Sequence, residues 1–205
     1  MPGNRILTVI DPTAEEQPAL ARSADLAAAL GSSLELFICD YDQYLAPRAL
    51  FDSPALEKAR ESVIEWDVER LEKLRAPLVE RGLSVEVDAR WGHPLDRAIA
   101  EKAHEVQPLF VAKDTHFHAA LKRTILSNTD WNLIRSCPAP LLLVKPRALS
   151  PRPTILAAVD PLHEHDKPAE LDKAILAFAK ELSTAVGGDL HVLHVYDTAP
   201  AIAAA

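Results

Sequence analysis

The sequence has little of several residue types on which common protein functions depend. Its 205 residues include 2 cysteines and 6 glycines, and no glycine lies between His93 and Val186. Two widely separated thiols form no disulfide framework, which is typical of a reduced, intracellular protein. The sequence contains no G-x-G-x-x-G, Walker A, G-x-S-x-G or C-x-x-C motif. It therefore gives no indication of a dinucleotide enzyme, a P-loop NTPase or a thiol redox enzyme, and no nucleophile–base pairing can be assembled.

Neither an excess of positive charge nor a long hydrophobic run is present. Lys and Arg number 22 against 30 Asp and Glu, and the parts before and after residue 151 each carry a net charge of −4. A surface without a basic excess does not favour nucleic acid or an anionic membrane. No apolar run approaches the roughly 20 residues of a membrane span, and the N-terminus lacks the features of a secretion signal. We expect a cytoplasmic protein with no nucleic-acid partner and no membrane span.

Short apolar runs alternate with helical patterns through the first 145 residues. Five strands are predicted, at residues 6–10, 34–39, 83–90, 109–112 and 141–144. Four helices are predicted, at residues 17–30, 54–81, 94–106 and 129–136. Pro77 lies inside the second helix and predicts a kink or an early end near Ala76. This alternation, with right-handed crossovers, predicts an α/β fold with an open, doubly wound parallel sheet of a flavodoxin-like or closely related layout. We expect the strand order 3-2-1-4-5, as in the adenine-nucleotide alpha-hydrolase-like layout.

An internal repeat begins after a proline-rich stretch. Residues 155–161 (ILAAVDP) repeat residues 6–12 (ILTVIDP) at an offset of 149, and a predicted strand at 190–195 repeats the second strand at an offset of 156. Repeats of this kind indicate duplicated structural units. We expect a complete domain over residues 1–147, a linker over 148–153, and the β-α-β beginning of a second domain over 154–205.

Ligands in open parallel sheets bind beyond the carboxyl ends of the strands, where the strand order reverses. Two segments flank that place in the predicted fold. Asp11 and Pro12 follow the first strand, and the segment from Lys113 to Lys122 follows the fourth. We expect any ligand site of the first domain to lie between these two segments.

Several motifs resemble those of the universal stress protein family. They are the strand end Val9-Ile10-Asp11-Pro12, the helix start Gln17-Pro18-Ala19-Leu20, and the closing segment Cys137-Pro138-Ala139-Pro140-Leu141-Leu142-Leu143-Val144-Lys145. The resemblance covers residues 5–146 and restarts over 154–197. Residues 91–94 (WGHP) and 123–131 (RTILSNTDW) are similar to tandem members of the family. The resemblance implies a cytoplasmic stress-response protein that can associate through sheet edges, between tandem domains or between subunits.

The resemblance also implies where a nucleotide would bind. Nucleotide-binding members carry G-x2-G-x9-G-[S/T] after the fourth strand, where glycines let backbone N–H groups approach the phosphates. Here the first two glycines fall on Lys113 and His116, and the third on Leu126 or Ser127. Side chains would fill the space that a phosphate needs, so we expect no ATP binding by the first domain. The residues of this degenerate nucleotide site are Asp11, Lys113, His116, Ser127 and Asn128.

The same segment carries a candidate metal site. Asp114, His116 and His118 supply a carboxylate and two imidazoles, which are ligand types suitable for Zn²⁺. A further ligand such as His93 would complete the site. The alternative is a polar surface loop with solvated histidines, and we weight it above the metal site.

Three functions are compatible with these patterns. The favoured one is a non-catalytic stress-response module that needs no cofactor and acts through binding or self-association. The second is a domain that binds Zn²⁺ or a phosphorylated or lipid-linked metabolite in the crevice around Asp11, Lys113, His116 and His118. The third, a nucleotide hydrolase, is the least favoured, because the glycines of its phosphate loop are missing.

Overall fold

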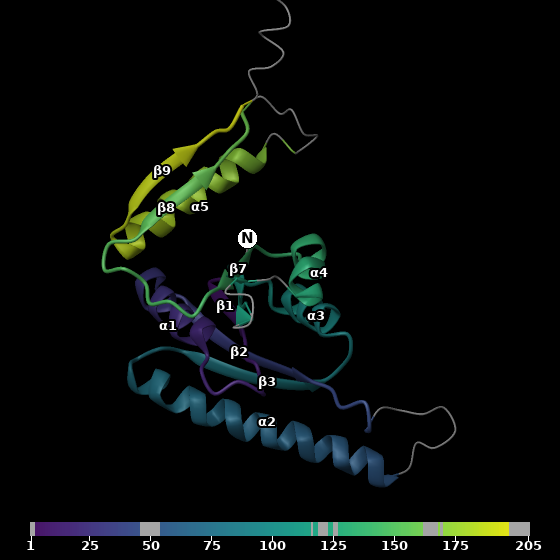
Figure 1. Cartoon of the computed structure of the whole chain (residues 1–205). Helices are drawn as coiled ribbons and strands as arrows, with labels where there is room; N and C mark the ends of the chain where they lie inside the picture. The colour runs from purple at the N-terminus through teal and green to yellow at the C-terminus, as the bar shows by residue number, and fades with distance from the viewer. Residues whose placement is uncertain are drawn as a thin grey trace, which may run out of the picture. The chain divides into compact units, whose positions relative to one another are not determined.

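The chain folds into two compact units, Met1–Ala148 and Leu149–Ala205, each of which is described by itself. The computed structural model describes residues 3–45, 54–115, 117–118, 123–124, 127–161, 168 and 170–196. Figure 1 shows the elements of both units.

The first unit is built on a five-stranded sheet in which neighbouring strands run parallel. Its order is β3-β2-β1-β4-β7, which confirms the predicted order 3-2-1-4-5. The strands are β1 (Arg5–Val9), β2 (Ser33–Asp40), β3 (Val85–Trp91), β4 (Phe110–Asp114) and β7 (Leu141–Val144). A two-residue pairing of β5 (Phe117–His118) with β6 (Arg123–Thr124) was not predicted. The two inner strands β1 and β2 are almost wholly buried, as their continuous apolar runs require.

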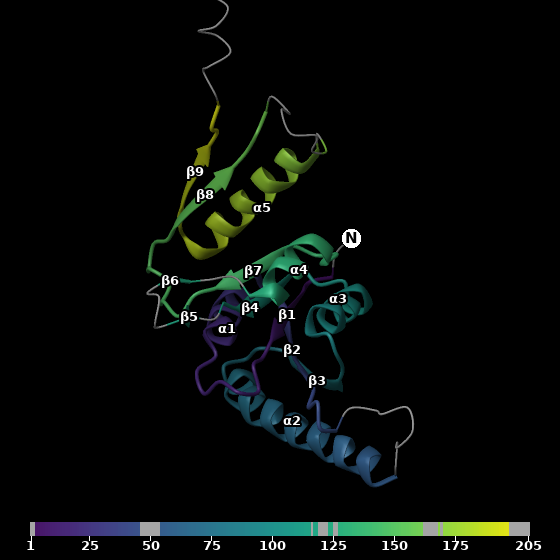
Figure 2. The same cartoon turned by 45° about the vertical axis from the view of Figure 1, so that its right-hand side comes forward.

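Four helices cover the two faces of this sheet. They are α1 (Pro18–Leu30), α2 (Pro54–Glu80), α3 (Leu95–Val106) and α4 (Asn128–Ser136). The first two lie on one face and the last two on the other, as Figures 1 and 2 show together. No helix in the described ranges of the chain is long and apolar enough to cross a membrane.

The core between the sheet and the α3–α4 layer is apolar. Leu7, Val9 and Phe37 project from the sheet and pack with Ile99 of α3 and Leu133 of α4. Burying a large aliphatic or aromatic side chain of this kind contributes about 1.5–3 kcal/mol. This core fixes α3 and α4 over the sheet and so positions the loops that lead into them.

Helix ends follow the glycine signals, but the proline signal inside α2 misleads. Gly31 and Gly82 adopt positive φ values of 64° and 85° directly after, or two residues after, their helices. Only glycine takes this conformation without strain. The helix α2 continues through Pro77 to Glu80, so the early end predicted near Ala76 as an alternative to a kink is wrong. Pro77 lies in the last turn, where the helix is about to end in any case.

A buried charge network crosses the same layer. Lys102 of α3 contacts the carboxylate of Glu35 on β2 and lies 2.8 Å from Asp88 on β3. Arg5 of β1 donates to Glu35 at 2.6 Å. Glu35 and Lys102 are both buried. Charges removed from water need such partners, so the network specifies how α3 sits on β2 and β3.

The second unit repeats the first β-α-β element of the first unit. Its elements are β8 (Thr154–Ala158), α5 (Glu170–Val186) and β9 (Asp189–Leu193). The strands β8 and β9 pair in parallel, with Ile155 opposite Leu190. This register matches that of β1 and β2, where Ile6 lies opposite Leu34. The predicted strand, helix and strand after the linker are therefore present.

Candidate functional site

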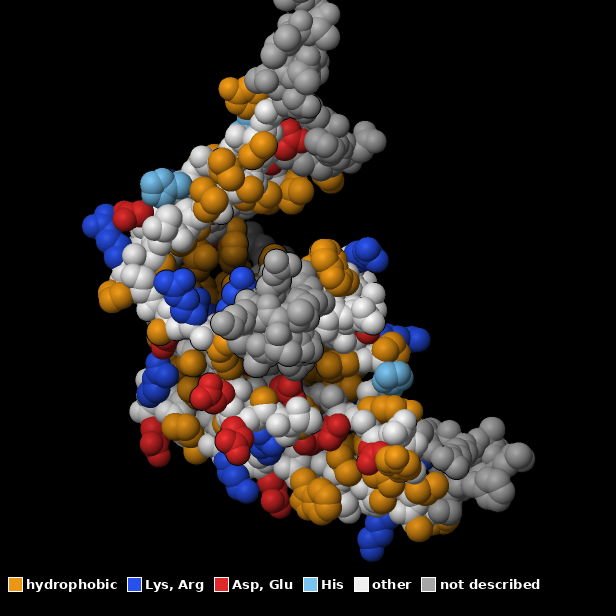
Figure 3. All heavy atoms as spheres, in the orientation of Figure 1, with side chains coloured by type: hydrophobic (Ala, Val, Ile, Leu, Met, Phe, Trp, Pro, Cys, Tyr) orange, Lys and Arg blue, Asp and Glu red, His pale blue; other side chains and the backbone are white. Residues whose placement is uncertain are grey.

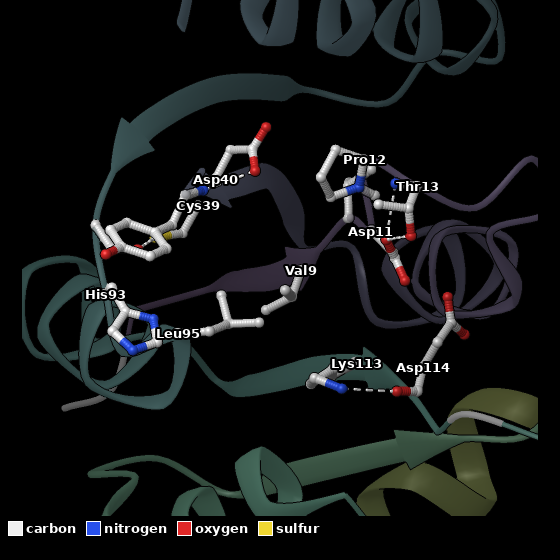
Figure 4. A pocket seen from close by; sticks show the side chains of 13 residues that line it. Val9, Asp11, Pro12, Thr13, Cys39, Asp40, His93, Leu95, Lys113 and Asp114 are labelled. Atoms are coloured by element: carbon white, nitrogen blue, oxygen red, sulfur yellow. Dashed lines mark hydrogen bonds between the residues drawn. The ribbon is translucent and has the colours of Figure 1, made fainter. Parts of the chain in front are cut away.

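A cavity of about 370 Å³ lies at the carboxyl ends of the central strands of the first unit. Asp11 and Thr13, after β1, lie across it from His93, which precedes α3 (Figure 4). Val9 and Leu95 lie between them. The cavity includes the place between the ends of β1 and β4 where we expect a ligand, and it extends beyond that place to the ends of β2 and β3.

Asp11 is held in a fixed turn at the edge of this cavity. Its carboxylate accepts hydrogen bonds from the backbone N–H and the hydroxyl of Thr13, at 2.8 and 2.6 Å. The Gln17 side chain closes the turn, because it accepts from the Asp11 N–H at 3.2 Å and donates to the Asp11 carbonyl at 2.7 Å. An aspartate that bonds the backbone two residues ahead stabilises a turn of this kind. The sequence-predicted residue Asp11 therefore lines the cavity.

Lys113 is buried and ion-paired. It belongs to β4, which continues to Asp114, so the prediction that the loop begins at Lys113 is wrong. Its Nζ lies 2.9 Å from the Asp130 carboxylate and donates to the Asp114 carbonyl at 3.0 Å. The Lys113 and Asp130 side chains are 7% and 0% exposed. Burial opposes ionisation of Asp130, but hydrogen bonds from Ser127 and Lys113 hold its pKa below the ordinary value.

Ser127 and Asn128 belong to the start of α4. Ser127 is the N-cap: its hydroxyl accepts from the Asp130 N–H at 3.1 Å, and its own N–H donates to the Asp130 carboxylate at 2.9 Å. These two bonds form a capping box, and Asn128 is the first helical residue. Buried Lys113 and Asp130, together with half-buried Ser127, thus form one group that joins β4 to α4.

The candidate metal ligands are only partly within the described residues. Asp114 accepts a hydrogen bond from the Ala19 N–H at the start of α1, at 2.6 Å. His116 and the side chain of His118 lie outside the described part of the chain. Within that part, no group of three His, Cys, Asp or Glu residues could hold a metal ion. The zinc site that includes His116 and His118 stays a prediction.

On the opposite side of the cavity, the sequence had indicated His93 but not Tyr41 or Cys39. The Tyr41 ring, after β2, stacks on His93 with centroids 4.5 Å apart. The Cys39 thiol donates to the Gly92 carbonyl at 3.3 Å. Burial, reinforced by the negative charge of Asp40, raises the pKa of Cys39 to about 11. We call the stacked pair of Tyr41 and His93 the Tyr41–His93 wall. The predicted adjacency of β2 and β3 could have indicated it, because residues that follow neighbouring parallel strands meet at the same edge of the sheet.

A carboxyl group in α2 has a perturbed proton affinity. Asp67 is 7% exposed, and its burial raises its pKa to about 6. The negative charge of Asp40, which lines the cavity, acts in the same direction, and Arg70 opposes it. Arg70 also donates to the carbonyls of Pro12 and Ala14, which ties α2 to the turn after β1. The cavity thus lies in a predominantly acidic environment.

Comparison with known proteins places these features in a family context. A family model described as "Universal stress protein family" matches residues 3–145. Universal stress protein E of Photorhabdus laumondii is 26% identical over 197 residues, which are 95% of this chain and 63% of that protein. Universal stress protein E of Escherichia coli K12 is 26% identical over 196 residues, which cover 95% and 62%. The chain therefore spans less than two thirds of the length of these curated relatives.

Two solved structures have the same fold over almost the whole chain. A functionally unknown protein, PA1789 of Pseudomonas aeruginosa PAO1, has a TM-score of 0.73 at 25% identity, and the match covers 98% of this chain and 64% of that one. A putative universal stress protein of Pseudomonas aeruginosa UCBPP-PA14 has a TM-score of 0.70 at 26% identity, with coverages of 98% and 65%. These likenesses extend across both units of the chain.

Proposed function

Since the chain belongs to the universal stress protein family and is similar to universal stress protein E, we propose that its first unit is a non-catalytic stress-response module whose cavity does not bind ATP. The observation that carries this proposal is the buried pair of Lys113 with Asp130. Lys113 occupies the position of the first glycine of the phosphate-binding motif, and its side chain is packed into the fold.

The pair acts against a triphosphate in two ways. First, the Lys113 side chain fills space that a glycine would leave to the phosphates, and the contacts with Asp130 and the Asp114 carbonyl hold it there. Second, its charge is already compensated by Asp130, so it supplies little attraction for an anion. Asp11, Asp40 and Asp114 also line the cavity, and their carboxylates repel negative charge. Steric exclusion and electrostatic repulsion therefore both oppose the binding of a triphosphate in this cavity.

The side chains of the cavity also support a non-catalytic role. A nucleophilic cysteine needs a lowered pKa, whereas that of Cys39 is raised to about 11, so the thiol stays protonated at neutral pH. His93 is stacked on Tyr41 on the other side of the cavity from Asp11. The Cys39 thiol of the cavity is therefore not an activated nucleophile.

Calorimetric titration of the full chain with Mg-ATP tests this proposal. We expect no saturable heat up to about 1 mM nucleotide, and no hydrolysis. The variant Lys113→Gly combined with Asp130→Asn removes the side chain without leaving a buried charge unpaired, and we expect it to bind ATP better than the unaltered chain. Lys145→Gly, at an exposed position, is the matched control. If the unaltered chain binds ATP with micromolar affinity and the double variant binds it no more tightly, the hydrolase alternative is favoured.

A second candidate function is favoured by the cavity itself. Its volume of about 370 Å³ and the stacked Tyr41–His93 wall suit a small molecule with a flat group. The surrounding carboxylates favour an uncharged or cationic ligand over the phosphorylated metabolite considered from the sequence. Metal analysis of the purified chain tests the zinc version, for which we expect bound zinc to be lost in His116→Ala and His118→Ala.

A further inference from the structure

The cavity of the first unit is apolar at its centre and bounded on one side by the Tyr41–His93 wall. Val9 and Leu95 lie between that wall and the turn at Asp11, as Figure 4 shows. Its volume of about 370 Å³ is near the lower end of the range for ligand pockets, which is roughly 300–1,000 Å³. Aromatic and aliphatic side chains in this arrangement suit a small ligand with a flat, apolar ring.

The Tyr41–His93 wall is held by bonds between the ends of β2 and β3. The Gly92 N–H donates to the Asp40 carbonyl at 3.1 Å, and the Cys39 thiol donates to the Gly92 carbonyl at 3.3 Å. A side chain in place of Gly92 would crowd this junction, because its Cβ atom would lie 3.2 Å from the Cys39 Sγ. The Tyr41 and His93 rings follow directly after these bonded residues and stack with centroids 4.5 Å apart. The wall is therefore formed before a ligand arrives, which lowers the cost of binding.

The residues that line the cavity carry an excess of negative charge. Lys113 is the only Lys or Arg among the described residues of the lining, and its Nζ lies 2.9 Å from the Asp130 carboxylate. Asp11, Asp40 and Asp114 all line the cavity. Asp and Glu side chains are also prominent over the part of the first unit between α1 and α2 in Figure 3. A ligand that enters this cavity therefore meets a negative electrostatic potential.

Asp40 is the carboxylate best placed to attract a positive charge. Its half-buried side chain accepts a hydrogen bond from the Tyr41 N–H, a neutral donor, at 2.7 Å. Among the described residues, no Lys, Arg or His forms an ion pair with it. Burial and then the Asp40 charge raise the pKa of Asp67 to about 6 and that of Cys39 to about 11. A cation beside Asp40 would offset this charge without displacing a lysine or arginine of the described residues.

We propose that the cavity binds a small organic cation with a flat aromatic ring, such as an N-alkylated heteroaromatic compound. Its ring packs along the Tyr41–His93 wall and over Val9 and Leu95, and its positive charge lies among the carboxylates of the lining. Cation–π attraction to the rings and Coulomb attraction to Asp40 both favour the charged ligand over its uncharged analogue. The inference rests on the proposed function, since it assigns to the same cavity a ligand whose charge is opposite to that of ATP.

Calorimetric titration of the full 205-residue chain with ligands of nearly the same shape and different charge tests the proposal. The probes are nicotinamide methylated at its ring nitrogen, which is a cation, nicotinamide itself, which is uncharged, and nicotinate, which is an anion. We expect the cation to bind with a Kd below about 1 mM and at least tenfold more tightly than nicotinamide, and nicotinate to give no saturable heat. Equal affinity for the cation and nicotinamide, or no saturable binding of the cation, would overturn the proposal.

Variants show whether the bound cation occupies this cavity. Tyr41→Leu removes a ring of the wall and should weaken cation binding about fivefold or more, whereas Tyr41→Phe keeps the ring and should leave the affinity nearly unchanged. Asp40→Asn keeps the acceptor for the Tyr41 N–H but removes the charge, and should weaken binding about tenfold. Asp42→Asn is the matched control, because Asp42 accepts from the Tyr44 N–H at 2.8 Å but does not line the cavity. Unchanged affinity in either Tyr41→Leu or Asp40→Asn would contradict the proposal.

Titration with Mg-ATP distinguishes a failure of this inference from a failure of the proposed function. Saturable binding of Mg-ATP would contradict the proposed function whether or not the cation binds. If neither Mg-ATP nor the cation binds, the proposed function stands and only the assignment of an organic cation is wrong.

Discussion

Asp67→Asn should stabilise the first unit at neutral pH and have almost no effect near pH 4. Burial, with the nearby charge of Asp40, raises the Asp67 pKa from 3.8 to about 6. One pKa unit corresponds to about 1.4 kcal/mol, so keeping this carboxylate ionised in the fold costs up to about 3 kcal/mol. Asparagine keeps the shape of the side chain and removes the charge.

The sign follows from proton uptake. The folded-state pKa is the higher one, so between about pH 4 and pH 6 the folded chain binds a proton that the unfolded chain has released. Stability therefore falls as the pH rises through this window, and the full penalty is present above pH 6. Well below pH 3.8 the carboxyl group is neutral in both states, and near pH 4 only a small part of the penalty remains, so Asp67 then behaves much like asparagine.

Urea unfolding followed by tryptophan fluorescence is a suitable assay, because Trp66, Trp91 and Trp131 all belong to the first unit. The difference in unfolding free energy between Asp67→Asn and the unaltered chain is compared at pH 7.5 and pH 4. We expect the stabilisation by Asp67→Asn to be about 1–3 kcal/mol larger at pH 7.5 than at pH 4. Glu69→Gln, at an exposed position on the same helix, is the control and should show no such difference. Equal differences at the two pH values would refute the reasoning.

Two further variants test the interactions that hold the helices of the first unit. Lys102→Met leaves Glu35 buried with only Arg5 as a charged partner, and we expect it to lower the unfolding free energy in urea by about 3–5 kcal/mol. Adding Glu35→Leu should restore part of this stability. If the double variant is no more stable than Lys102→Met, the unpaired charge of Glu35 is not the cause of the loss. Ser127→Ala removes the N-cap of α4, and we expect it to lower the unfolding free energy by about 1 kcal/mol. The control Ser136→Ala, at an exposed position of the same helix, should change the unfolding free energy by less than half of that. Equal effects of the two variants would argue against the capping role of Ser127.

Hydrophobic periodicity predicted the order of the elements along the chain, and the connection rules of α/β sheets were needed to predict the strand order. The strands β1 and β2 are buried on both faces, and Gly31 and Gly82 adopt positive φ values beyond the ends of α1 and α2. Pro77 did not end α2, although a proline at this position removes one backbone hydrogen bond to the carbonyl four residues before it.

The site was predicted less completely, because its chemistry depends on pairs distant in sequence. The position of Asp11 followed from the strand order, but the pairing of Lys113 with Asp130 did not. A lysine at the end of a predicted strand is expected to be exposed to solvent. Lys113 is buried because α4 packs against β4 and β7. The Tyr41–His93 wall likewise exists only once β2 and β3 lie side by side.

The most direct test of the central claim is a crystal structure of the full chain grown with several millimolar Mg-ATP. The account predicts that Lys113 Nζ stays within about 3 Å of Asp130, as in the 2.9 Å contact here, and that no triphosphate lies between β1 and β4. A triphosphate bound there, with Lys113 displaced from Asp130 or turned to the phosphates, would contradict it.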